Sequence, residues 1–376
     1  MSEMPMTWVT ARVHHYDPDW TPLLLEAVRP LFAALHQAAP KAHFVRHWRF
    51  GPHLQLRWNT DQDTLRHIVQ PAVEEIVGGH LTRRPSTARI DAAELLRQHR
   101  RLAELENAPG PLTPLAPDNS ISWSVGPLGR DAHDEVVQQL LADFYTDTTP
   151  LAFETVAATR TGPAARLAFA VDLMVTVAHC MYPGPDNPTI SEGFVSYRSH
   201  AEAYIAMTPN RSAVKEHFEQ EYRRVAPALV DRVRKTVAAL DTDAPLPLVR
   251  PWLDLARAHV DSGDRLVNDG ELIMPFPRLK NTGELGWDQD WVTHSQFHTM
   301  MNGSGAYLEL LSRTPWFQRY RLALSLMYLH LNRIGITPVE RYLLSHLVAN
   351  AVEDAYGVSA DGHVRAVIDN AERRVS

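Results

Sequence analysis

Strand-like patterns are confined to the first 125 residues of this chain, and almost everything after Gly129 has the periodicity of helices. The clearest alternation runs from Trp8 to Tyr16, where Val9, Ala11 and Val13 face one side. The four segments that we predict as strands are Trp8 to Tyr16, His43 to Phe50, His53 to Trp58 and Ile121 to Val125. Strands gathered at one end of a long helical chain are typical of α+β architecture.

Helical periodicity links the strands and fills the rest of the chain. We predict helices over Trp20–Ala38, over Asp61–Val77 with a stop at Gly78-Gly79, and over Asp91–Glu106. Further predicted helices span 131–145, 150–159, 163–181, 191–207, 212–239, 247–267, 294–313, 316–333 and 338–356. The fold class is therefore α+β: an antiparallel sheet unit with flanking helices (1–130) merged with a mainly helical region (131–376) into one compact unit.

Composition excludes several classes of protein. The formal charge is −7 and the pI about 6.2, so the whole chain has no electrostatic attraction to nucleic acid or to an anionic membrane. Cys180 is the single cysteine, which excludes a disulfide framework or a cysteine-rich metal site. Met1 to Met6 is polar rather than signal-like, and we find no 18-residue apolar run. We expect a soluble, cytoplasmic protein without nucleic-acid or membrane partners.

Familiar nucleotide and metal motifs are missing from the sequence. There is no Walker A sequence, no H-E-x-x-H and no G-x-S-x-G, and Gly303-Ser304-Gly305 follows a helix rather than a strand. Among the 19 histidines, His294 and His298 have the i, i+4 spacing that a metal can use, but no carboxylate stands at ligand spacing. We predict no metal site.

The third predicted strand carries the most informative pattern. His53, Gln55 and Arg57 share one of its faces, while Leu54, Leu56 and Trp58 share the other. The polar face lies beside that of the first strand, which adds Arg12 and His14. Such a face is suited to the floor of a pocket for a polar backbone or an anion, or it is simply a solvated sheet surface.

A second polar pattern closes the helical region. Ser325, Tyr328 and Asn332 follow an i, i+3, i+7 spacing and share one face of a largely apolar helix. The same spacing recurs upstream at Ser295, His298 and Asn302. These stripes indicate either a buried polar network or a site. The alternative interpretations are a core tyrosine at position 328 and, for Arg333, a charge complementing the end of the helix.

Together these segments resemble one family. The run Gly51 to Arg57 is similar to the "GPHLRLR" strand of the C-terminal elimination domain of lantibiotic dehydratases. Ser325 to Gly335, followed by Pro338, Glu340 and Leu343-Leu344, resembles that domain's closing helix pair. Ala142 to Thr148 resembles its central "F…DS" segment, and the resemblance spans roughly residues 7 to 355.

Departures from that family's pattern separate this chain from the eliminating enzymes. Gln55 stands where the first strand arginine is expected, and Tyr328 where the closing helix has its first histidine. Ser120 to Gly126 lacks the Glu and Arg of the central "ExxRYGG" motif. A chain of this length with these changes resembles the pyridine synthases of thiopeptide biosynthesis.

That resemblance implies a formal aza-[4+2] cycloaddition between two dehydroalanines of a leader-bearing peptide, with loss of water and leader peptide. It implies no metal or organic cofactor, and a homodimer is compatible with it. On this basis we expect Tyr328 to move the proton, assisted by His298, Ser295 or Gln296. The expected substrate-binding residues are Arg57, Gln55, His53, Arg12, Asn302, Asn332 and Arg333.

Three other interpretations stay open at this stage. The chain is alternatively the elimination subunit of a split dehydratase, which releases glutamate from glutamylated Ser or Thr. A non-catalytic scaffold that binds leader peptides is the second alternative. The third is a helical protein unrelated to peptide modification.

Overall fold

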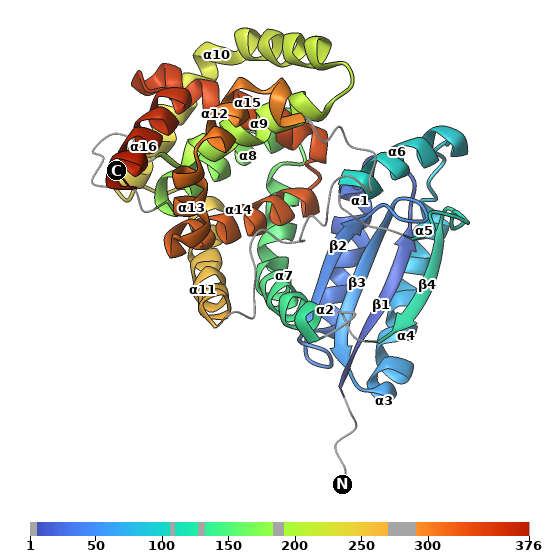
Figure 1. The fold of residues 1–376 in the computed structure, drawn as a ribbon. Coiled ribbons are helices and arrows are strands. Elements are labelled where there is room, and N and C mark those ends of the chain that lie inside the picture. Colours follow the sequence, from blue (N-terminus) through green and yellow to red (C-terminus); the bar gives the residue numbers. More distant parts are fainter. Residues whose placement is uncertain (1–5, 106–109, 127–131, 183–191, 270–290, 376) are drawn as a thin grey trace. The chain divides into compact units, whose positions relative to one another are not determined.

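A computed structural model describes residues 6–105, 110–126, 132–182, 192–269 and 291–375. The chain forms two compact units, Met1–Thr161 and Gly162–Ser376. The predicted α+β class is confirmed, with an antiparallel sheet in the first unit and helices throughout the described part of the second (Figure 1). The boundary predicted from the sequence lies at residue 130. Helix α7 (Ala132–Ala158) contacts strand β2, so the first unit extends to Thr161.

The sheet has four antiparallel strands in the order β2-β3-β1-β4. They are β1 (Thr7–His14), β2 (Ala42–His47), β3 (His53–Thr60) and β4 (Ser120–Val125). Every predicted strand is present. In the central pair, Ala11 lies opposite Leu56 and Val13 opposite Leu54, so the apolar alternation of both strands falls on the same face.

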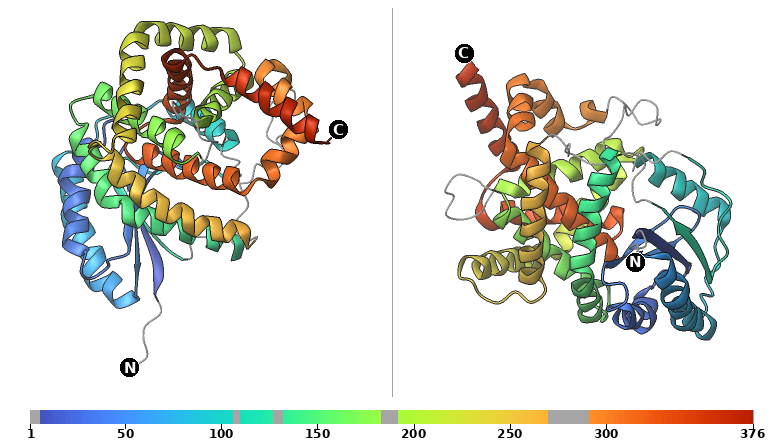
Figure 2. Two further views of the ribbon diagram at one scale, coloured as in Figure 1. Left: turned by 90° about the vertical axis from the view of Figure 1, so that its left-hand side faces the viewer. Right: turned by 90° about the horizontal axis from the view of Figure 1, so that it is seen from below.

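Two interrupted helices cover the apolar face of the sheet (Figures 1 and 2). The first comprises α1 (Thr21–Leu23), a wider π-helical stretch (Leu24–Val28) and α2 (Arg29–Leu35). The second comprises α3 (Gln62–Thr64), a π stretch (Leu65–Val69), α4 (Gln70–Ala72), another π stretch (Val73–Gly78) and α5 (Gly79–Arg83). Phe32 packs against Phe44 and Trp58 of the sheet. Wide turns just before Pro30 and Pro71 accommodate residues that lack an N–H.

The predicted stop at Gly78-Gly79 is wrong, because the second helix continues to Arg83. Neither glycine adopts the left-handed conformation of a helix end, and Gly79 has φ −60°. The apolar stripe simply continues across the pair, with Val73, Val77 and Leu81 all buried. Each glycine costs about 1 kcal/mol of helix propensity, and burial of this stripe outweighs that cost.

A tight turn joins β2 to β3 and depends on Gly51. Its φ of +110° lies in the region that favours glycine, and a Cβ there would come 2.0 Å from the Tyr16 hydroxyl. That hydroxyl donates to the carbonyl of Ala116 at 2.5 Å. Gly51 therefore lets the Tyr16 ring close over the end of the sheet where His53 begins β3.

Helices α6 (Ala92–Leu105) and α7 complete the first unit. The sequence predicted two helices in place of α7, but the structure has one that continues through Pro150. Buried residues on both sides of the proline hold the helix together, among them Phe144, Leu151 and Phe153. Phe153 stacks on Phe44 of the sheet at 5.0 Å between ring centroids. Packing on β2 therefore outweighs the local break that proline favours.

The second unit is built around α8 (Pro163–Cys180), which contacts α10, α11, α14 and α15. The remaining helices are α9 (Val195–Met207), α10 (Arg211–Asp241), α11 (Val249–Asn268), α12 (Gln296–Gly303), α13 (Gly305–Arg313), α14 (Pro315–Arg333), α15 (Pro338–Tyr356) and α16 (Ala360–Val375). The predicted helix over 294–313 is two helices, because Ser304 is extended and caps α13 through the Tyr307 N–H. Helix α16 was not predicted.

Helix α8 is also the one described helix that is long and apolar enough to cross a membrane by composition. Half of its apolar window is buried inside the protein. Its Asp172 carboxylate pairs with Arg232 and accepts from the Thr236 hydroxyl at 3.0 Å. A helix with these contacts is the core of a helical unit, and its length and composition alone are weak evidence for a membrane span.

Candidate active site

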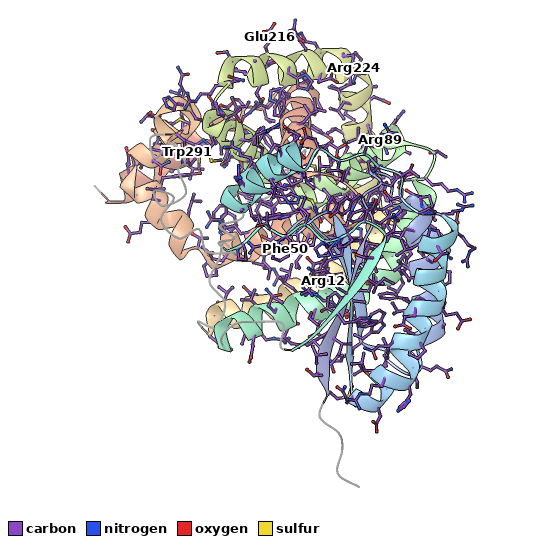
Figure 3. All side chains as sticks on the ribbon, turned by 90° about the vertical axis from the view of Figure 1, so that its right-hand side faces the viewer. Arg12, Phe50, Arg89, Glu216, Arg224 and Trp291 are labelled. Atoms are coloured by element: carbon purple, nitrogen blue, oxygen red, sulfur yellow. The ribbon has the colours of Figure 1, made fainter. Side chains whose placement is uncertain are left out.

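The polar face of the sheet gathers most of the strand residues that the sequence singled out. Register places Arg12 opposite Gln55 and His14 opposite His53. Arg12 projects from the face away from the two covering helices (Figure 3). From the flanking strands, the face gains His43, His47, Ser120, Ser122 and Ser124.

Three successive residues of this face in β3 form a hydrogen-bonded row. His53 Nδ1 lies 2.8 Å from the Gly51 carbonyl oxygen, which can only accept, so Nδ1 carries the proton. His53 Nε2 is then the acceptor for the Gln55 amide nitrogen at 3.2 Å. The Gln55 amide oxygen in turn accepts from Arg57 Nη2 at 2.5 Å. Every hydrogen bond of the row therefore points from donor to acceptor toward Gly51, and Arg57 is the donor at the far end.

Three histidines of the face, His14, His47 and His53, are neutral at physiological pH. Burial is the main cause that lowers the pKa of His53 to about 3 and those of His14 and His47 to about 4. Nearby arginine charge lowers all three further. His47 Nδ1 accepts from the backbone N–H groups of Trp48 and Arg49, at 3.0 and 3.1 Å, which requires a neutral ring.

In the part of the chain that the structure describes, no carboxylate pairs with the positive charge of this face. Neither Arg12 nor Arg57 forms an ion pair with any described residue, and the buried Nε of Arg57 has no hydrogen-bond partner. Burial and the charge of Arg12 both lower the pKa of Arg57. His14, His53 and Gln55 are buried, and Arg12 and Arg57 are half-buried. Guanidinium groups without an ion-pair partner among the described residues are suited to carbonyl or carboxylate oxygens.

The second cluster lies in the helical unit and centres on Tyr328 of α14. Its hydroxyl lies 2.7 Å from Nδ1 of His200 in α9 and 3.5 Å from the Ser345 hydroxyl in α15. Ser345 donates its own proton to the Arg341 carbonyl at 2.9 Å, so it can only accept from Tyr328. The phenol is half-buried. The phenol proton points either to His200 or to Ser345. We call these three hydrogen-bonded side chains the Tyr328 relay, because a phenol in this position can exchange its proton.

A second hydrogen-bonded histidine adjoins this relay. His298 in α12 has Nδ1 3.0 Å from the Ser295 hydroxyl and Nε2 3.1 Å from the Ser199 hydroxyl. Ser295 caps α12 by accepting from the His298 N–H. The Trp291 ring meets His298 edge to face at 4.8 Å. Two of the three predicted proton-transfer partners, Ser295 and His298, therefore lie in one network, and residue 199 joins it to α9.

Burial keeps both histidines and the tyrosine uncharged. It lowers the pKa of His298 to about 4 and is the largest cause that lowers the pKa of His200 to about 3. The charges of Arg341 and Arg321 lower the pKa of His200 further. Burial raises the pKa of Tyr328 well above its usual range, and Arg341 and Ser345 oppose that change. At neutral pH the phenol is protonated and both imidazoles are neutral.

The other predicted residues of this unit lie around the two networks. Gln296 is exposed on the first turn of α12, and the exposed Asn302 donates to the His298 carbonyl at 2.9 Å. Asn332 is half-buried on the helix that carries Tyr328. Arg333 is buried and its charge acts on the buried His330. Arg333 thus lies in the buried last turn of the helix that carries Tyr328.

Sequence reasoning missed Ser199, His200 and Arg341. The first two are consecutive in α9, and no spacing motif marks them because their partners are 99 and 128 residues away. Among the described residues, no group of three His, Cys, Asp or Glu side chains could hold a metal ion. What the helical cluster offers is proton exchange between neutral groups.

Comparisons with known proteins agree with this fold. The family model for the C-terminal part of lantibiotic biosynthesis dehydratases matches residues 8–352. The solved structure of the pyridine synthase TbtD from thiomuracin biosynthesis is 33% identical, with a TM-score of 0.75, and the match covers 94% of this chain and all of that one. The structure of TsrL, 22% identical with a TM-score of 0.70 over 96% of this chain and 99% of that one, shares the fold. No curated protein sequence matches significantly.

The chain belongs to the family of the C-terminal domain of lantibiotic biosynthesis dehydratases. Within that family it is similar over almost its full length to a thiopeptide pyridine synthase, as the sequence resemblance predicted. Both chains are of similar extent, since the match leaves none of TbtD uncovered.

Proposed function

We propose that this protein is a pyridine synthase of thiopeptide biosynthesis that acts on a leader-bearing peptide containing two dehydroalanines. The observation that carries the proposal is the 2.7 Å contact between the half-buried Tyr328 hydroxyl and neutral His200. The 33% identity to TbtD over 94% of the chain supports the same reaction class. The leader-bearing peptide is the only partner that the proposed reaction requires.

The reaction needs one amide to become an iminol, which supplies the aza-diene. Two C–C bonds then form: one joins the β-carbons of the two dehydroalanines, and the other joins the iminol carbon to the second α-carbon. The adduct loses the former carbonyl oxygen as water and the leader peptide as its amide. The two former methylene carbons each give up a proton, and a pyridine remains. Bringing two alkenes of one flexible peptide together supplies much of the rate enhancement.

Tyr328 is the group proposed to perform the amide-to-iminol exchange. Its phenol donates to the carbonyl oxygen while its own oxygen takes the amide proton, and His200 orients the hydroxyl. Neither group holds an ion at neutral pH, because the pKa of His200 lies near 3 and that of Tyr328 is raised. The exchange therefore starts and ends with neutral partners, and partial negative charge develops on the phenol oxygen only while its proton is in transit. His298, with Ser295 and Ser199, is the second proton-transfer group for the later losses.

Peptide binding is the proposed role of the polar sheet face. Arg12 and Arg57 provide cationic donors without a carboxylate partner among the described residues. His53 and Gln55 hold Arg57 in place through the directional row. Peptide carbonyl oxygens are the acceptors that such donors recognise. Gln55 is neutral, and the face therefore carries less positive charge than the two-arginine strand of the eliminating enzymes that this strand resembles.

Mass spectrometry of the purified protein with a leader-bearing, azole-containing peptide that carries two dehydroalanines tests the proposal. A macrocycle lighter by one water and the leader amide is the expected product. A glutamylated Ser peptide is the matched alternative substrate. Release of glutamate from it, with no macrocycle from the first peptide, would replace the proposal with the elimination activity. Leader binding without any change of mass would indicate a scaffold.

A further inference from the structure

Arg341 of α15 lies on the face of the Tyr328 ring. Its guanidinium carbon is 4.7 Å from that ring's centroid and 5.2 Å from the centroid of the neighbouring Tyr342 ring. Both distances are within the range of cation–π attraction. The arginine is half-buried, so water screens its charge less than at a free surface.

The charge of Arg341 is not neutralised by a carboxylate among the described residues. Its sequence neighbour Glu340 is occupied, because that carboxylate accepts from the Thr337 N–H at 2.8 Å in the capping box of α15. Arg198 shows the contrast, since it pairs with Glu353 one helix turn from the end of α15. Arg341 therefore holds a full positive charge whose described contacts are two aromatic faces.

We propose that Arg341 is a positioning residue of the reaction: from the face of the Tyr328 ring, its cation stabilises the negative charge that develops on the phenol oxygen during proton exchange. This inference rests on the proposed function of Tyr328. Burial alone makes that charge costly, because a buried phenolate lacks water. A cation over the ring restores part of the lost stabilisation without touching the substrate.

Among the residues that the structure describes, no other cation acts on the phenol to the same extent. Arg321 of α14 has its guanidinium over the Phe317 ring at 4.9 Å, and its charge lowers the pKa of His200 but not that of Tyr328. The titratable groups that face the relay from its packing helices are Tyr342 and Arg341 of α15, Arg321 and Tyr320 of α14, Tyr197 of α9 and His298 of α12. Among the described residues this set contains no carboxylate that would oppose ionisation of the phenol. Removal of Arg341 therefore leaves the hydrogen bond of Ser345 as the described contact that still favours the ionised form.

A direct titration tests the electrostatic part. A difluorotyrosine in place of Tyr328 ionises at accessible pH, and fluorine NMR of the full chain follows its midpoint. We expect Arg341→Met to raise the midpoint by about one pH unit and Arg341→Lys to raise it less, since lysine keeps the charge. Arg319→Met, which removes an arginine of α14 paired with Asp261, is the control and should leave the midpoint unchanged. An equal midpoint in Arg341→Met and the parent overturns the proposal.

Turnover of the dehydroalanine peptide tests the catalytic part. Arg341→Met is expected to lower kcat about tenfold with KM unchanged, and Arg341→Lys to recover part of that loss. A rise of KM alone, or a wild-type kcat, contradicts the role. A wild-type protein that leaves the peptide unchanged overturns the proposed function instead, and the titration still decides whether Arg341 stabilises the phenolate. Arg341→Gln replaces Arg341→Met if the latter does not fold.

Discussion

Ser199 and His200 are consecutive residues of α9, yet they hydrogen-bond to two different helices. Ser199 contacts His298 of α12 at 3.1 Å, and His200 contacts Tyr328 of α14 at 2.7 Å. One turn of α9 therefore contacts both of the proposed proton-transfer groups, His298 and Tyr328. Neighbouring positions on a helix diverge by about 100°, so the two contacts lie on different sides of α9.

Removing the Tyr328 hydroxyl should abolish most of the activity while leaving the peptide bound. Tyr328→Phe keeps the ring under Arg341, and we expect kcat to fall by about 10²–10⁴-fold because a positioned acid–base group is lost. Isothermal titration with the peptide should give an unchanged affinity. Tyr222→Phe, which removes a hydroxyl bound to Asp354 outside both networks, is the control. Full turnover by Tyr328→Phe would exclude the phenol from the chemistry.

Turnover should not depend on His200 ionisation in the physiological range. Its pKa near 3 leaves the imidazole neutral, so no acidic limb from this group appears as pH falls from 8 toward 5. His200→Phe should lower kcat because the hydroxyl loses its 2.7 Å partner, whereas His200→Asn should retain part of the rate. The pH profile of kcat checks this. An activity loss near pH 6.5 that vanishes in His200→Asn would mean that this imidazole titrates normally.

Neutralising Arg12 should weaken peptide binding without destabilising the fold. Arg12 forms no ion pair with any described residue, and its positive charge repels that of Arg57. Arg12→Gln should therefore raise KM while the midpoint of thermal unfolding stays the same or rises. Arg97→Gln is a matched control, because Arg97 is exposed on α6 and paired with Glu94. A lower unfolding midpoint together with an unchanged KM would assign Arg12 a structural role.

The sheet unit should lose stability as pH falls through the weakly acidic range. His14, His47 and His53 have folded pKa values of about 4, 4 and 3, below the unfolded value of 6.5. The unfolded chain therefore binds more protons between these values, so their contribution is full above pH 6.5 and declines toward pH 4. Thermal unfolding at a series of pH values should show this decline, and His14→Gln should make it shallower. An identical slope in both proteins would contradict the assignment.

Ser304 should matter for the stability of the C-terminal helices. Its hydroxyl caps α13 at the Tyr307 N–H and donates to Glu372 of α16 at 2.9 Å. Ser304→Ala is expected to reduce the free energy of unfolding by about 1 kcal/mol. Ser262→Ala, which removes an exposed hydroxyl inside α11, should have little effect. Chemical denaturation of the two variants distinguishes a real cap from a surface hydroxyl.

Local patterns predicted the sheet well because its determinants are short-range. Alternation in β1 and β3 placed Arg12, Gln55 and Arg57 on one face, and Gly51-Pro52 marked the turn between the strands. Local signals failed where tertiary packing decides. The second covering helix continues through Gly78-Gly79 into α5, and α7 continues through Pro150. In both places the packing of buried side chains outweighs the low helix propensity of glycine and proline.

Only part of the candidate site in the helical unit could be predicted from the sequence, because tertiary packing brings its other residues together. Tyr328 and His298 stood out because they lie on polar stripes of apolar helices. Their partners His200 and Ser199 carry no such pattern, and Arg341 looks like an ordinary helix arginine until its position over Tyr328 is known. Local patterns along the chain do not show which distant helices become neighbours.

The hydrogen-bonded row from Gly51 to Arg57 makes the orientation of the Gln55 amide depend on the backbone carbonyl of Gly51. Because the carbonyl fixes the proton on Nδ1 of His53, the Gln55 amide must turn its NH₂ group to the imidazole and its oxygen to Arg57. A second proton on that imidazole would demand the opposite amide rotamer, with the NH₂ group facing the guanidinium. One protonation event at the turn would thus detach Arg57 two residues away, and the low pKa of His53 keeps that event out of the working pH range.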